Sequence, residues 1–125
     1  MNSVLQNTRR HDITVARSGR IDLTARVVHL LDIRPGDVLD ISIDGCEWYL
    51  YVRLRAPLIG RHVAQCYPSS RRGRTSGSYR LYSKQLADAV YSATGRTDSV
   101  LRLPCGTPVT IANKLYLPII IRCIL

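Results

Sequence analysis

Residues 13–41 read ITVARSGRIDLTARVVHLLDIRPGDVLDI, and this stretch carries the clearest signals of the fold. Ile13–Val15 and Ile21–Leu23 are short apolar-rich runs on either side of a glycine-containing loop, a pattern that predicts two strands. Apolar residues recur at helical spacing over Ala25–Leu31, and Thr24 before them is a suitable N-cap. Arg34–Asp37 contains Pro and Gly where a turn favours them, so we expect a turn after this short helix.

The residues after this turn predict a pair of half-buried strands. Apolar and polar residues alternate over Leu39–Ile43 and again over Trp48–Leu54, and Asp44-Gly45 between them predicts a tight turn. Because one face of each strand is apolar, we expect these side chains to share a core with the preceding helix. The expected set is Leu39, Ile41, Ile43, Trp48, Leu50 and Val52, together with Val27, Leu31 and Ile33.

The second half of the chain contains one strong helix signal. Lys84–Thr94 has apolar residues on one side, Ser83 as an N-cap and Gly95 just after its end. Before it, Pro68–Ser78 has no apolar residue and predicts a mobile basic loop. Further strands are predicted at Val100–Leu103, Val109–Ile111 and Leu115–Ile121, the last two as a hairpin.

The length of 125 residues suits one domain with its own core. The predicted fold class is α+β and rich in strands, with an N-terminal tail at 1–12, one unit at 13–55 and a second, basic unit at 56–125. The order strand, strand, helix, strand, strand occurs twice, and Gly19–Leu23 aligns with Gly77–Leu81. This order predicts two divergent repeats in one chain.

Several function classes lack any signal in the sequence. No apolar run approaches the ~18 residues of a membrane span, and residues 1–12 have no apolar signal-peptide segment, so we expect a cytoplasmic protein without a membrane partner. The cysteines at positions 46, 66, 105 and 123 show no metal-binding spacing, and no known catalytic motif is present. We therefore expect no metal, no cofactor and no enzymatic activity.

Positive charge is abundant and unevenly distributed. The chain has 18 basic and 9 acidic residues, giving a formal net charge of +9, and 16 of the basic residues are arginine. Residues 1–55 carry 8 basic and 7 acidic side chains, whereas residues 56–125 carry 10 and 2. Because the arginine fork pairs well with phosphate, this pattern indicates a polyanion, most often nucleic acid. The alternative is a generally basic protein whose arginine content reflects genome composition.

Residues 13–52 resemble the AbrB/MazE/SpoVT family of swapped-hairpin DNA-binding proteins. An ordered set carries the resemblance: Ile13-Thr14 in a strand, the turn and strand Gly19–Leu23, a short helix, and Leu31–Ile41 leading into a third strand. The resemblance implies an AbrB-like barrel of interleaved hairpins, a homodimer, and sequence-specific binding of double-stranded DNA by a transcriptional regulator. A second copy in the same chain would let the two halves complement each other without a partner.

Three positions depart from the family pattern. Thr24 stands where the family usually has Pro, Asp32 where it usually has Gly, and Val28 where many members have a DNA-contacting basic residue. Thr can cap a helix that Pro would begin. Asp32 is expected to adopt a left-handed backbone conformation, which Asp tolerates better than most residues.

The expected DNA contacts come from two parts of the chain. By position, the resemblance implies Arg20 in the Gly-Arg turn, with Arg17 beside it. The basic segment downstream would add phosphate contacts, because base contacts specify sequence and phosphate contacts position the protein. For the basic loop, the alternative is a solubilising linker. The full set of candidates is Arg17, Arg20, Arg26, Arg61, Arg71, Arg72, Arg74 and Arg80.

A second function from another class is a protein–protein interaction or assembly module. In that case the apolar C-terminal strand would bind another chain, together with a surface formed by Tyr49 and Tyr51 beside Arg53 and Arg55. Salt dependence of duplex DNA binding discriminates between the two functions.

Overall fold

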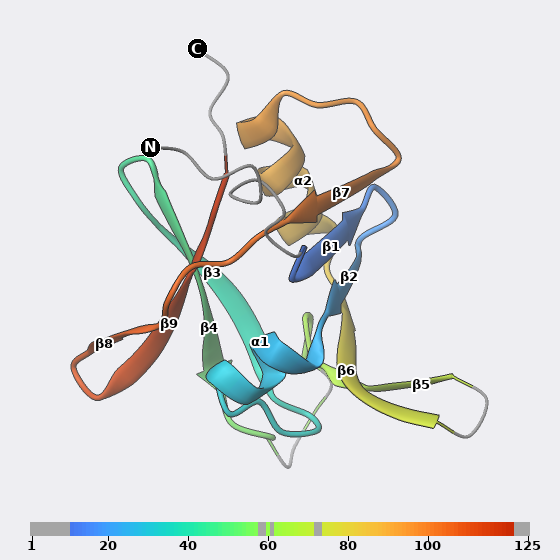
Figure 1. Cartoon of the computed structure of the whole chain (residues 1–125), viewed down its shortest axis with the longest axis vertical. Helices are drawn as coiled ribbons and strands as arrows, with labels where there is room; N and C mark the ends of the chain where they lie inside the picture. The colour runs from blue at the N-terminus through green and yellow to red at the C-terminus, as the bar shows by residue number, and fades with distance from the viewer. Residues whose placement is uncertain (1–10, 58–59, 61, 72–73, 122–125) are drawn as a thin grey trace, which may run out of the picture.

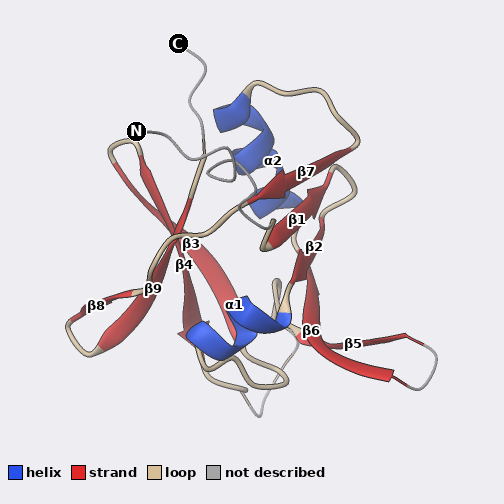
Figure 2. Ribbon diagram, in the orientation of Figure 1, coloured by secondary structure: helices blue, strands red, loops and turns tan. Residues whose placement is uncertain are grey.

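The computed structural model describes residues 11–57, 60, 62–71 and 74–121, and at residues 70, 71 and 74–76 it describes the backbone alone. This part of the chain is α+β and rich in strands, as predicted, with two antiparallel sheets and two helices (Figure 2). The described strands form open sheets and close no barrel. Neither described helix has the length and apolar character that crossing a lipid bilayer requires.

The first sheet, here called sheet A, has the order β5-β6-β2-β1-β7. Its strands are β1 (Ile13–Ala16), β2 (Arg20–Leu23), β5 (Tyr67–Arg71), β6 (Arg74–Tyr82) and β7 (Val100–Leu103). Two hairpins, β1–β2 and β5–β6, lie side by side because their inner strands β2 and β6 pair with each other. β7 adds to the outer edge of β1.

The second sheet, sheet B, has the order β3-β4-β9-β8. Its strands are β3 (Val38–Asp44), β4 (Glu47–Leu54), β8 (Val109–Ile111) and β9 (Lys114–Ile119), and β8–β9 is the hairpin that the sequence predicts. Each sheet takes strands from both predicted units, 13–55 and 56–125. The two units therefore interleave in space, although each is continuous in sequence.

One helix follows each hairpin of sheet A: α1 (Ala25–Leu30) after β2 and α2 (Lys84–Thr94) after β6 (Figure 1). The caps predicted for α2 are confirmed, since the Ser83 side chain accepts a hydrogen bond from the Leu86 amide at 3.1 Å and Gly95 has a φ of 64°. Thr24 occupies the N-cap position of α1 without a side-chain capping bond.

Apolar side chains of both sheets and both helices form one core. Most of the predicted core set is confirmed as buried, namely Val27, Leu31, Ile33, Leu39, Trp48, Leu50 and Val52. Ile41 is only half-buried, and the prediction is wrong for Ile43, which is 53% exposed. β3 is an edge strand, and its exposure increases toward its last residues, next to the Asp44-Gly45 turn.

The prediction of a loop over Pro68–Ser78 is wrong for the described residues of this segment, 68–71 and 74–78, because they lie in β5 and β6. The segment lacks apolar side chains, but backbone pairing does not require them. β6 pairs with β5 on one side and with β2 on the other, where Leu23 lies opposite Tyr79. The pairing of β5 with β6 therefore supplies the structure that the local composition does not indicate.

Gly19, in the turn that carries the family resemblance, has a structural requirement for glycine. Its φ is +101°, and a Cβ atom there would lie 3.0 Å from the Lys84 amide nitrogen. The turn lies against the start of α2, where the Ser83 amide donates to the Gly19 carbonyl at 2.9 Å. Asp32 has a φ of 50°, so the left-handed conformation expected there is confirmed.

Among the described cysteines, two buried thiols should be unreactive in the folded protein, whereas one is accessible. Burial raises the pKa of Cys66 and of Cys105 to about 12, while Cys46 is exposed in the β3–β4 turn. Because only the thiolate reacts, iodoacetamide at mildly alkaline pH should alkylate Cys46 well before Cys66 and Cys105. Mass spectrometry of the labelled peptides tests this, with unfolded protein as the control. Equal labelling of Cys66 and Cys46 in the folded protein would contradict it.

Candidate functional site

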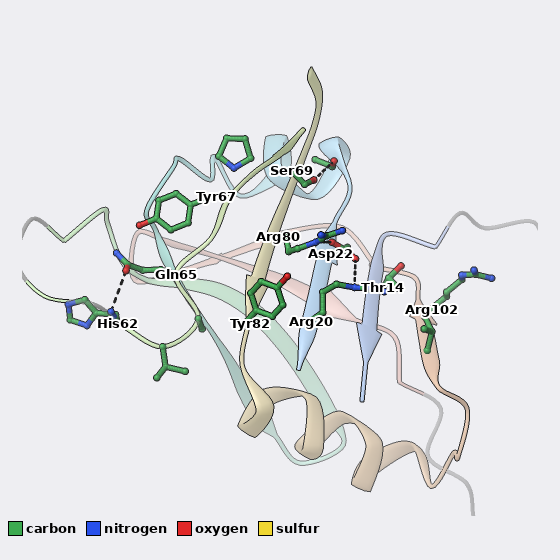
Figure 3. Close-up of a pocket in the computed structure, with 15 residues that line it drawn as sticks. Thr14, Arg20, Asp22, His62, Gln65, Tyr67, Ser69, Arg80, Tyr82 and Arg102 are labelled. Atoms are coloured by element: carbon green, nitrogen blue, oxygen red, sulfur yellow. Dashed lines mark hydrogen bonds and ion pairs between the residues drawn. The ribbon is translucent and has the colours of Figure 1, made fainter. Parts of the chain in front are cut away.

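The outer face of sheet A is polar and forms an open groove of about 1210 Å³. Alternation along the strands places Leu23, Leu81 and Leu101 inward, where the helices pack, and the intervening polar residues outward. Segment 62–65 borders one side of the groove (Figure 3). The polar lining of this sheet A groove includes Thr14, Arg20, Asp22, Gln65, Tyr67, Ser69, Ser78, Arg80, Tyr82 and Arg102.

Two arginines in the groove share one carboxylate. Asp22 and Arg80 are direct partners in the β2–β6 register, and Arg80 Nε donates to Asp22 Oδ1 at 2.6 Å. Arg20 Nε lies 3.2 Å from Asp22 Oδ2 on the same face. This second contact is an ion pair by distance but not an aligned hydrogen bond, so Arg20 Nε is buried without a hydrogen-bond partner in the described chain.

Electrostatics in the groove favour anions. The hydrogen bond to Asp22 raises the pKa of Arg80 above its ordinary value, so this side chain stays charged. Arg102 comes from β7 and forms no ion pair with an acid of the described chain. Three arginines against one carboxylate leave a formal charge of +2 with His62 neutral.

Aromatic and hydroxyl groups complete the groove. Tyr67 is 52% and Tyr82 is 61% exposed, so each presents a ring to solvent. The hydroxyls of Ser69 and Ser78 lie 2.8 Å apart across the β5–β6 pair. Thr14 lies opposite Arg102 in the β1–β7 register. The groove thus offers cations, hydroxyl donors and stacking surfaces, and the described residues contain no cluster of metal ligands.

No family model, curated protein or solved structure matches this chain. The chemistry of the site therefore has to follow from its own residues. Of the predicted DNA contacts, the groove contains Arg20 and Arg80, which are distant in sequence and adjacent in space.

Two further predicted contacts lie outside the groove. Arg17, in the β1–β2 turn, is exposed and lies 4.9 Å from the centroid of the Tyr91 ring. Arg26 donates to the buried carboxylate of Asp12 at 2.8 Å, so it has a structural partner. Arg26 is nevertheless 52% exposed at its side chain.

The remaining candidates belong to the β5–β6 hairpin or to positions that are not described. The backbones of Arg71 and Arg74 pair with each other near the end of the hairpin. Arg61 and Arg72 lie outside the described residues, as does the end of the apolar C-terminal segment. β6 runs from Arg74 to Tyr82, so the hairpin end and the Arg20 end of the groove are about 26 Å apart at ~3.3 Å per residue.

The sequence predictions missed Asp22, Arg102, Tyr67 and Tyr82 as groove residues. Asp22 and Arg102 each alternate with buried apolar residues in a short strand, which marks them only as facing away from the core. The missing information was which strands are neighbours. Once β2 is known to lie between β1 and β6, the outward positions of the three strands form one surface.

Sheet B has a different outer face, with a cluster of tyrosines. Tyr116 lies 6.3 Å from Tyr49 and 5.1 Å from Tyr51 between ring centroids, and Lys114 lies over Tyr51 at 4.9 Å. Hydrogen bonds join the Tyr49 hydroxyl to Glu47 and the Tyr51 hydroxyl to Asp40. Arg55, expected beside these tyrosines, instead contacts the buried Asp37. This face is of mixed charge and is a weaker candidate for a polyanion.

Proposed function

We propose that the protein binds DNA through the outer face of sheet A. The observation that carries the proposal is the grouping of Arg20, Arg80 and Arg102, from three strands, in one open groove with a single carboxylate. Arginine forks bind phosphate oxygens with two parallel hydrogen bonds, and phosphate contacts supply most of the affinity of a DNA-binding protein.

The shape of the β5–β6 hairpin supports double-stranded DNA as the ligand. The hairpin projects from the body of the protein (Figure 1), and its residues Tyr67, Ser69 and Ser78 line part of the groove. A two-stranded ribbon is one of the elements that the major groove of DNA admits, and the strands of this ribbon contain Arg71 and Arg74. In this proposal the ribbon makes base contacts and the groove makes phosphate contacts, which reverses the division expected from the sequence and still gives a sequence-specific regulator of transcription both kinds of contact.

The proposal also keeps the relation to swapped-hairpin proteins. Two hairpin–helix units, β1–β2–α1 and β5–β6–α2, meet through their inner strands, which supports an origin from interleaved repeats within one chain. An AbrB-like barrel would require closure beyond the two open sheets. Homodimerisation stays a prediction from the resemblance.

One observation favours the alternative of a protein-interaction module. Val109 and Ile111 on edge strand β8 are 39% and 56% exposed, next to the tyrosine cluster of sheet B. An exposed apolar edge strand is a template for pairing with another chain. This surface lies on the other sheet, so the two functions are tested independently.

Salt dependence of duplex binding tests the proposal. The logarithm of the association constant should fall linearly with the logarithm of salt concentration, and the combined substitution Arg20→Ala, Arg80→Ala and Arg102→Ala should reduce the slope by ~0.9 per lost phosphate contact. Fluorescence anisotropy with labelled random-sequence duplexes measures both quantities.

The control removes the same charge elsewhere, with Arg34→Ala, Arg53→Ala and Arg96→Ala. These side chains are exposed, outside the groove and in surface ion pairs. Equal losses of duplex affinity in the two triple variants would mean that net charge alone explains the effect, and this would contradict the assigned site. Absence of duplex binding in the wild type would favour the interaction module.

A further inference from the structure

The carboxylate of Asp22 lies between the guanidinium groups of Arg20 and Arg80 on the floor of the sheet A groove (Figure 3). Each carboxylate oxygen faces a different arginine: Oδ1 accepts from Arg80 Nε at 2.6 Å, and Oδ2 lies 3.2 Å from Arg20 Nε. All three side chains are partly buried, at 28% exposure for Asp22, 39% for Arg20 and 41% for Arg80. The carboxylate therefore holds both arginines in place from one side.

The contacts with Asp22 involve only one nitrogen of each arginine. An arginine has five N–H donors, of which Nε carries one and the two terminal nitrogens carry four. The ion pairs with Asp22 are formed by Nε of each arginine, and Arg80 also has a side-chain hydrogen bond with Tyr82. Arg20 Nε is itself without a hydrogen-bond partner. These contacts use only part of the donor capacity of the two guanidinium groups, which leaves donors for a ligand in the groove.

The fold, rather than chance surface pairing, places these three groups together. Asp22 and Arg80 are opposite each other in the β2–β6 register, and Arg20 is two residues from Asp22, which puts it on the same face of β2. One carboxylate neutralises only one of the two arginines, and Arg102 adds a further positive charge in the same groove. The site is therefore built with an excess of positive charge that an anion can neutralise.

We propose that Asp22 positions Arg20 and Arg80 as a clamp for one phosphate group. Two forks presented side by side match the several acceptor oxygens of a phosphate, and bidentate contacts with phosphate are a particular strength of arginine. By holding the Nε edges, Asp22 orders two otherwise flexible side chains before the ligand arrives, which lowers the entropy cost of binding. The identification of this phosphate with the DNA backbone rests on the proposed function.

The proposal predicts a change in duplex affinity that is opposite in direction to the change expected from net charge alone. Removing an acid raises the net charge and on that ground strengthens binding to a polyanion. Asp22→Asn should instead weaken duplex binding by roughly tenfold, because the two arginines lose their shared anchor. The matched control is Asp98→Asn, which removes the same charge from an exposed ion pair with Arg96 outside the groove. That control should leave affinity unchanged or increase it slightly.

Two ligands separate this inference from the proposed function. Fluorescence anisotropy follows a labelled duplex, and NMR shifts of the arginine Nε–H signals follow inorganic phosphate. Weaker binding of both ligands to Asp22→Asn supports the clamp. If the wild type binds no duplex and Asp22→Asn binds phosphate more weakly than the wild type does, the clamp is supported and the DNA function is removed. Stronger duplex binding by Asp22→Asn, as for the control, overturns the clamp and leaves the DNA function in place. If the wild type binds neither ligand, both proposals fail.

A second variant keeps the positive charges of the two arginines and removes their planar guanidinium groups. Arg20→Lys with Arg80→Lys preserves two cations but replaces planar forks with point charges. The clamp predicts a loss of roughly tenfold in duplex and phosphate binding. Unchanged affinity in this folded variant would overturn the proposal even if Asp22→Asn does not fold.

Discussion

Asp37→Ala should lower the free energy of unfolding by about 3–5 kcal/mol, the largest single effect expected in this protein. The Asp37 side chain is fully buried and accepts hydrogen bonds from the amides of Arg34 at 2.8 Å and Ala56 at 2.9 Å. It also accepts from Arg55 Nη1 at 2.8 Å. The substitution leaves two amides without their acceptor and a buried cavity, whereas the half-exposed Arg55 can return to water.

The position of Asp37 connects this stability effect to the groove. The Asp37 backbone carbonyl accepts from the Cys66 amide at 2.9 Å, so the turn before β3 holds the segment that borders the sheet A groove. Urea denaturation followed by circular dichroism measures the loss, with the exposed Asp98→Ala as control. A cost below about 1 kcal/mol for Asp37→Ala would mean that its hydrogen bonds are readily replaced by water.

Leu81→Ala should cost about 2–5 kcal/mol of stability. Leu81 is 1% exposed in β6, the strand that joins the β5–β6 hairpin to β2 at the centre of sheet A. The substitution leaves a cavity under the sheet that the helices and neighbouring strands can fill only in part. Loss of this side chain should therefore destabilise the whole chain rather than the hairpin alone.

The matched control for Leu81 is its neighbour Tyr82, which is 61% exposed on the opposite face. Tyr82→Ala should change stability by no more than about 0.5 kcal/mol, since exposed side chains contribute little to the core. Both variants are compared by thermal and urea denaturation. Comparable costs for the two substitutions would place β6 in a register shifted by one residue, because a shift of one exchanges the two faces of a strand.

Local patterns predicted the elements whose signals lie within a few residues. Lys84–Thr94 is a helix with both predicted ends, because Ser83 caps it and Gly95 takes the left-handed conformation that ends it. Trp48 is buried because strict alternation over β4 determines which face is apolar. By contrast, Pro68–Ser78 was predicted as a loop, and its described residues instead form strands because β5 and β6 pair with each other, which local composition does not indicate.

The candidate site depends on contacts that no local pattern contains. Asp22 and Arg80 are 58 residues apart, and only the pairing of β2 with β6 makes them neighbours. Arg26 illustrates the converse, since a basic residue near a helix start indicates DNA contact from sequence, while its actual partner Asp12 is buried and 14 residues away. A basic residue can serve a structural ion pair or a ligand equally well, and the nearest acid in space decides which.

The sequence by itself determined the strand-rich α+β class, the α2 helix, the β8–β9 hairpin and the excess of arginine, because each is a property of composition or of neighbours along the chain. Only the tertiary structure decided that the two halves interleave in both sheets and that Arg20, Asp22, Arg80 and Arg102 share one open face. The physical reason is that alternation specifies which side of a strand avoids the core, whereas the order of strands in a sheet depends on burying all the apolar faces together.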